Sequence, residues 1–147
     1  MTELKKVSDR VASQEQKQLI IQDGPLGIGC PVIAATGNLN LAIVIIEPTK
    51  AAFHDADRYI QIPKRFGIPV SVILNKSDMN PEGSLEIKRY LSEHSIELLG
   101  EIPLENQWPY SITAGIPIVR FSPECPASLE LKKIAEKIVR YIQCSHH

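Results

Sequence analysis

A carboxylate followed by a glycine-rich segment is the first feature of the sequence that could do chemistry. Asp23 closes a short apolar run at residues 19–21, and positions 24–29 read Gly-Pro-Leu-Gly-Ile-Gly. A carboxylate at the end of a buried strand can hold Mg²⁺ through water, because magnesium prefers oxygen ligands and keeps much of its hydration. Glycines just after it let the backbone approach a phosphate or change conformation. A tight turn capped by Asp23 explains the same residues equally well.

Three more polar segments follow apolar runs further along the chain. They lie at residues 47–49, 75–78 and 102–106. In open α/β sheets, ligands bind beyond the carboxyl ends of the strands. If the apolar runs are parallel strands, these segments and the one at 23–29 share one rim of the sheet. The sequence therefore predicts a single ligand-binding edge built from four loops.

The elements that must position these loops alternate between strands and helices. The run at 41–46 is continuously apolar, which is typical of a strand covered on both faces. Pro63 is expected to kink or shorten the helix that contains it. The alternation predicts right-handed crossovers and an α/β fold with an open, mostly parallel sheet and helices on both faces. The expected strands are residues 19–21, 41–46, 70–74 and 97–101, and the expected helices are 2–16, 31–36, 51–66, 82–94, 106–114 and 127–143.

Two of these helices have apolar faces that should pack on the sheet. The helix at 127–143 has the clearest helical period, and its apolar residues fall on one face. The candidate core contacts are Phe53, Ala56, Ile60 and Phe66 in the helix at 51–66, and Leu131, Ile134, Ala135, Ile138, Val139 and Ile142 in the last helix.

Composition limits the class of protein. The 147 residues are 44% hydrophobic, which suits one globular domain over residues 1–147, and no linker or repeat divides them. The net charge is -1 with both signs interspersed, so neither a nucleic-acid footprint nor a polybasic membrane patch is indicated. The longest apolar run is far too short to span a bilayer. We expect a cytoplasmic protein.

Five segments, taken in order, resemble a known family. They read DGPLGIGCPVIAA, VIIEPTKAAFHDADR, FGIPVSVILNKSDMN, LLGEIPLENQ and AGIPIV. Over roughly residues 18–120 the chain resembles the MinD/ParA/Mrp group of deviant Walker P-loop ATPases. It is especially similar to MinD-like ATPases that carry an inserted ferredoxin domain. The resemblance implies the C-terminal portion of a MinD-like nucleotide-binding domain, which is a partial P-loop NTPase fold.

The resemblance assigns the first segment to the phosphate side of a nucleotide site. It implies that Asp23 supports Mg²⁺ indirectly, together with the attacking water, as the catalytic carboxylate. It places Gly24, Pro25 and Gly27 in the switch loop near the γ-phosphate. One departure is Leu26, which occupies the second position of the family's usual Pro-Pro pair.

The third and fourth segments correspond to the base side of that site. The resemblance implies that the Asn75 amide hydrogen-bonds adenine and that Lys76 and Asp78 complete the loop. The backbone around Ile102 and Pro103 would line the other side of the base. An ordinary polar turn between strand and helix is the competing interpretation of residues 75–78.

A working P-loop ATPase also needs a glycine-rich loop with a Lys that cradles the phosphates. These residues contain no match to G-x-x-x-x-G-K-[ST] or to the family's lysine-rich variant. The family implies ATP or ADP with Mg²⁺ as ligands. No iron-sulfur cluster is expected in this chain, because the cysteine-rich ferredoxin insert is absent from its sequence.

Three hypotheses follow. The first is a truncated or split ATPase half that does not hydrolyse ATP alone and is completed by a P-loop-bearing partner. The second is a non-catalytic interaction or oligomerisation module that kept the fold and lost nucleotide chemistry. The third is a small enzyme with an unrelated site on the same rim. A missing neighbour strand leaves an edge that can pair with another chain, so we also expect a homo-oligomer.

Overall fold

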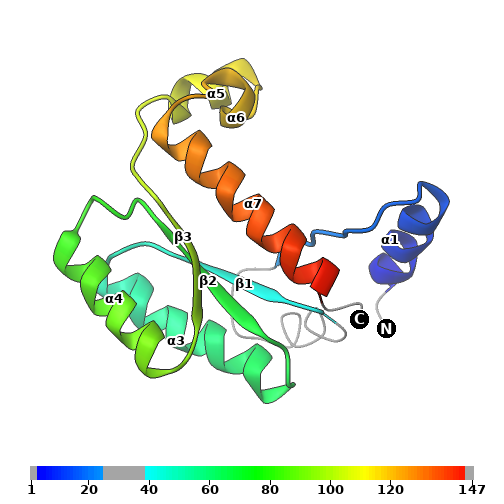
Figure 1. Cartoon of the computed structure of the whole chain (residues 1–147), viewed down its shortest axis with the longest axis horizontal. Helices are drawn as coiled ribbons and strands as arrows, with labels where there is room; N and C mark the ends of the chain where they lie inside the picture. Colours follow the sequence, from blue (N-terminus) through cyan, green and yellow to red (C-terminus); the bar gives the residue numbers. More distant parts are fainter. Residues whose placement is uncertain (1–2, 25–38, 145–147) are drawn as a thin grey trace.

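The computed structural model describes residues 3–24 and 39–144. Its centre is a parallel three-stranded sheet in the order β1-β2-β3, with helices on both faces (Figure 1). This confirms the predicted open α/β fold. The strands are β1 (Ala42–Ile46), β2 (Val70–Asn75) and β3 (Glu97–Ile102), and the helices are α1 (Glu3–Gln14), α3 (Lys50–Arg65), α4 (Pro81–Glu93), α5 (Trp108–Ala114), α6 (Ile118–Phe121) and α7 (Pro126–Cys144).

Local sequence signals set the ends of several helices. The Thr49 hydroxyl caps α3 by accepting a hydrogen bond from the backbone N–H of Ala52 at 3.2 Å. Asn80 caps α4 in the same way, directly before Pro81 at the first helical position. Helix α5 ends at Ala114, where the helix expected at 106–114 also ends, and Gly115 follows as its cap with a left-handed φ of 64°. Pro63 lies in the last turn of α3 and is buried there.

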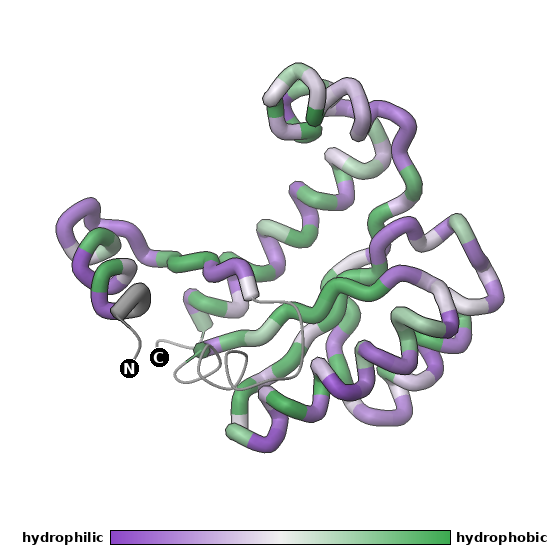
Figure 2. Tube along the Cα trace, turned by 180° about the vertical axis from the view of Figure 1, so that it is seen from behind, coloured by the Kyte–Doolittle hydropathy of each residue, from purple (hydrophilic) through white to green (hydrophobic). Residues whose placement is uncertain are grey.

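The sheet separates two apolar cores. Alternate residues of β2 face opposite sides, so Val72 and Leu74 pack with α3 and α4, whereas Ile73 packs with α7. The apolar residues follow the strands at the centre of the molecule, while the outer turns of the helices are largely hydrophilic (Figure 2). Helix α7 approaches β3 closely at Gly100, where an added Cβ would lie 2.5 Å from Cγ1 of Ile134. Gly100 therefore allows this helix–strand contact.

The predicted double coverage of β1 is wrong. Ile46 is buried, but Ile43 and Ile45 are 36% and 65% exposed. Helix α7 packs on β3, on the far side of β2 from β1, so it does not cover this part of the sheet. A continuous apolar run indicates that both faces of a strand could be buried. It does not indicate whether a helix packs on each of those faces.

The strand expected at residues 19–21 is also wrong. This segment is not in a strand, and its three apolar residues are exposed, with Ile21 at 83%. No strand of the described sheet pairs with it, and a short apolar run cannot form a ladder without a partner. Helix α1, which precedes it, stands to one side of the sheet (Figure 1).

Two core predictions for the helices need correction. Phe66 is 56% exposed, because it lies at the C-cap of α3, beyond the turns that face the sheet. In α7 the packed face is narrower than the periodicity indicated: Ile134 is buried, whereas Ala135 and Val139 are exposed. The single turn of α6 was not predicted. Among the described helices, none is long and apolar enough to cross a membrane.

Candidate functional site

The loops that follow the three strands are tied together at the carboxyl edge of the sheet. From β1 to β2, Nζ of Lys76 lies 2.8 Å from Oε1 of Glu47. In the same region, the side-chain amide of Asn80 donates to the backbone carbonyl of Pro48 at 3.0 Å. The β1 loop is therefore held to both ends of the β2–α4 connection.

The β2 and β3 loops are joined by two further hydrogen bonds. The backbone N–H of Ser77 donates to the carbonyl of Ile102 at 3.0 Å. The backbone N–H of Leu104 donates to Oδ1 of Asp78 at 2.7 Å. The structure thus brings together three of the four loops that the sequence placed on one rim.

Asn75 lies at the junction of these two loops. It is the last residue of β2, and it is paired in register with Ile102, the last residue of β3. Its side chain is half-buried, and within residues 3–24 and 39–144 it has no hydrogen-bond partner. A side-chain amide offers both a donor and an acceptor, so it can bind a heterocycle that presents the complementary pair. Lys76 follows with a left-handed φ of 52°, which turns the chain sharply after the strand.

The expected phosphate side is described only in part. Asp23 and Gly24 are exposed, and a Cβ added at Gly24 would have no neighbouring atom within 4 Å. Pro25 and Gly27 lie outside the described residues. No described contact joins Asp23 to the tied loops, and in the described part of the chain no cluster of His, Cys, Asp and Glu could hold a metal ion. Asn75 therefore offers an amide, unpartnered among the described residues, that could pair with a heterocycle at this edge, whereas no described contact connects Asp23 with it.

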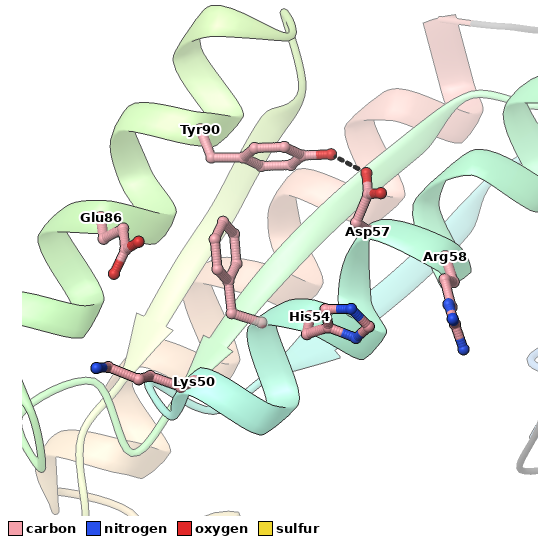
Figure 3. Close-up of a pocket in the computed structure, with 7 residues that line it drawn as sticks. Lys50, His54, Asp57, Arg58, Glu86 and Tyr90 are labelled. Atoms are coloured by element: carbon pink, nitrogen blue, oxygen red, sulfur yellow. Dashed lines mark hydrogen bonds between the residues drawn. The ribbon is translucent and has the colours of Figure 1, made fainter.

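A second feature, which the sequence did not reveal, is a pocket of about 440 Å³ between α3 and α4 (Figure 3). The hydroxyl of Tyr90 on α4 points at the carboxylate of Asp57 on α3 and donates a hydrogen bond to it. The Phe53 and Tyr90 rings meet edge to face, with centroids 5.2 Å apart. The pocket is lined by Lys50, Phe53, His54, Asp57, Arg58, Glu86 and Tyr90.

The Tyr90–Asp57 contact changes the acidity of both groups. The hydrogen bond from Tyr90, with a second from Gln61, holds the pKa of the Asp57 carboxyl below its ordinary value. Burial, followed by the hydrogen bond to Asp57, raises the pKa of Tyr90 to about 12. At neutral pH Tyr90 is therefore protonated and Asp57 is ionised, which is the state in which this hydrogen bond forms. This contact joins the two helices that flank the β1 and β2 loops, so we assign it a structural role.

The contacts that sequence reasoning missed are those made between elements. Asn80 had a signal, because an Asn before Pro is a typical start of a helix, but its bond to Pro48 depends on the tertiary fold. The bond from Leu104 to Asp78 spans separate loops, and no spacing indicates it.

The sequence and the fold are similar to those of several known proteins. No protein-family model matches the sequence. An uncharacterized ATP-binding protein of Methanocaldococcus jannaschii is 26% identical over 122 residues, which are 83% of this chain and 46% of the relative. A chloroplastic homologue of the septum site-determining protein MinD, from Arabidopsis thaliana, is 30% identical over 124 residues, which are 82% of this chain and 38% of the relative. The chain spans between 25% and 46% of the length of the curated relatives that it matches.

Solved structures agree with the sequence relatives. A chain of the MinC:MinD cell division protein complex of Aquifex aeolicus superposes with a TM-score of 0.76 and 25% identity, covering 91% of this chain and 57% of that one. MinD of Pyrococcus horikoshii, solved in complex with Mg-ADP, gives a TM-score of 0.67 and 23% identity, covering 79% and 48%.

The open parallel sheet with helices on both faces is the α/β fold of the MinD P-loop ATPases. The resemblance to MinD/ParA-type ATPases that the motifs indicated is thereby confirmed, in sequence and in fold.

Proposed function

We propose that this chain provides the base side of a MinD/ParA-type nucleotide site, in which the amide of Asn75 hydrogen-bonds adenine. The observation that carries the proposal is the half-buried Asn75 amide, unpartnered among the described residues, where the β2 and β3 loops meet. Lys76 and Asp78 are held in the contacts that fix these loops. Ile102 and Pro103 supply the backbone on the other side of the base.

The phosphate side is the part that these residues leave incomplete. In the proposed site Asp23 supports Mg²⁺ through water, and Gly24, Pro25 and Gly27 form the switch loop. The printed sequence contains no P-loop, although phosphoryl transfer depends largely on phosphate positioning and charge stabilisation. We therefore expect weak binding of ATP or ADP and no hydrolysis by these residues alone. A partner half that carries a P-loop would complete the site.

Calorimetry with Mg-ADP and Mg-ATP tests this proposal. We expect saturable binding that weakens about ten-fold or more in Asn75→Ala, because the base loses its paired amide. Asn40→Ala is the matched control, since Asn40 is exposed just before β1, at the opposite end of the strands. The absence of binding up to millimolar nucleotide, or equal loss in both variants, would contradict a base site at Asn75.

A second function, an oligomerisation module, has its own supporting observation. The β1 strand is at the edge of the described sheet, and its exposed residues Ile43 and Ile45 lie on the face that α7 leaves open. No charge or proline interrupts the strand, and such edges pair readily with a further strand. We propose a second copy of this chain as the partner, because two antiparallel β1 strands would match each other's apolar side chains across a two-fold axis. Light scattering after size-exclusion chromatography tests it, and a clean monomer would count against it.

A further inference from the structure

The carboxylate of Asp78 links two loops that are far apart in the sequence. Its Oδ1 accepts the backbone N–H of Leu104 at 2.7 Å, across 26 positions of the chain. The adjacent residue, Ser77, donates its own N–H to Ile102 and accepts from the hydroxyl of Ser84 at 2.6 Å. A hydrogen bond to an ionised acceptor is stronger than a neutral one, so the Asp78 contact reinforces the Ser77–Ile102 bond between these loops even though Asp78 is exposed.

The position of this tie relates it to Asn75. Asp78 follows Asn75 by three residues, and Leu104 follows Ile102, the register partner of Asn75, by two. The hydrogen bond between Leu104 and Asp78 therefore fixes the position of the loop after β3 relative to the Asn75 amide.

We propose that Asp78 is a positioning residue of the base site. It holds the loop after β3 in place by accepting the Leu104 N–H, a contact we call the latch, and it does not itself contact the base. This inference rests on the proposed nucleotide site. It makes a distinction that the motif alone does not, because a carboxylate three residues after an asparagine could also contact the base directly.

Adenine and guanine present different hydrogen-bonding groups, and this difference distinguishes a positioning role for Asp78 from direct contact with the base. Guanine presents two adjacent donors, N1–H and N2–H, which match the paired oxygens of a free carboxylate. Adenine presents one donor, N6–H, beside the acceptor N1, and this pair matches an amide such as Asn75. Because Oδ1 already accepts the Leu104 N–H, pairing both Asp78 oxygens with guanine would compete with this bond. Guanine would then be paired less completely than adenine at this edge, which favours ADP over GDP.

Two substitutions at Asp78 distinguish a latch from a base contact. Asp78→Asn keeps an oxygen that can accept the Leu104 N–H, whereas Asp78→Ala removes it. We expect Asp78→Ala to weaken ADP binding about ten-fold and to speed hydrogen exchange of the Leu104 amide several-fold in the nucleotide-free protein. Asp78→Asn should lose less than Asp78→Ala in both measurements, by about three-fold at most, because its amide oxygen still accepts the Leu104 N–H although the bond is no longer charge-assisted. Asp9→Ala, on α1, is the control for loss of an exposed aspartate.

The same calorimetry with Mg-GDP completes the test. We expect the wild type to prefer ADP over GDP by about ten-fold or more. Unchanged Leu104 exchange in Asp78→Ala would overturn the latch while leaving the Asn75 site intact. Equal loss of ADP binding in Asp78→Asn and Asp78→Ala, or tight GDP binding by the wild type, would show direct contact by the carboxylate and would also overturn it. The wild type could bind no nucleotide while Asp78→Ala still speeds Leu104 exchange. That result would contradict the proposed base site, and with it the positioning role of Asp78.

Discussion

Replacing Tyr90 with phenylalanine should remove one defined contact between α3 and α4. The variant loses only the hydroxyl, so the edge-to-face packing of the ring on Phe53 is retained. What disappears is the hydrogen bond to the Asp57 carboxylate. Hydrogen bonds to charged groups contribute about 1.5–3 kcal/mol when buried, but Asp57 is exposed to water. We therefore expect Tyr90→Phe to lower the free energy of unfolding by about 1 kcal/mol at neutral pH.

The pH dependence of this loss follows from the two pKa shifts. The folded-state pKa of Asp57 is lowered, so its contribution is present above the ordinary value of 3.8 and is lost as the pH falls below it. The folded-state pKa of Tyr90 is raised to about 12, so its contribution is complete below the ordinary value of 10.0 and is lost as the pH rises toward 12. The difference between wild type and variant should therefore be largest between these limits and shrink at both ends.

Urea denaturation at a series of pH values measures this difference. Tyr110→Phe is the matched control, because the Tyr110 ring is 64% exposed and lies on α5, away from the pocket. A Tyr90→Phe difference that stays constant from pH 3 to pH 7 would refute the reasoning, since it would show that ionised Asp57 is not the partner. An effect of the same size in Tyr110→Phe would refute it as well.

Two further predictions concern packing and assembly. Gly100→Ala should lower the free energy of unfolding by about 1–3 kcal/mol in urea denaturation, because the new Cβ would lie 2.5 Å from Cγ1 of the buried Ile134; wild-type stability would contradict the close approach of α7. Ile45→Lys should convert a wild-type dimer to monomer by light scattering, because it places a charge on the exposed face of β1, whereas the exposed control Ile112→Lys should not. Dissociation by both variants, or by neither, would contradict pairing through β1.

The sequence predicted the elements that depend on local signals. The apolar run at 70–74 and the end of the helix expected at 106–114 each depend on a few neighbouring residues, and the structure has a strand at Val70–Asn75 and a helix that ends at Ala114. The order of these elements then predicted the parallel sheet, because strands that alternate with helices are joined by crossovers. The meeting of the loops at residues 47–49, 75–78 and 102–106 follows from that topology.

The failures share one physical cause: burial depends on partners that are distant in the sequence. Ile45 has the same apolar character as residues of β2, but it is 65% exposed, because among the described helices α7 packs on β3 and not on β1. The run at 19–21 has the composition of a strand, yet a strand requires a neighbour to satisfy its backbone. The bond of Asp78 to Leu104 and the bond of Tyr90 to Asp57 depend on how loops and helices meet, which no local pattern encodes.

The most direct test of the nucleotide site is an NMR titration of the nitrogen-15-labelled chain with Mg-ADP. We predict that the side-chain amide signals of Asn75 and the backbone signals of Ile102 and Leu104 shift together and saturate, while those of Asn40 stay in place. Shifts confined to the pocket around Tyr90, or no shifts up to millimolar ADP, would contradict a base site at the carboxyl edge of the sheet.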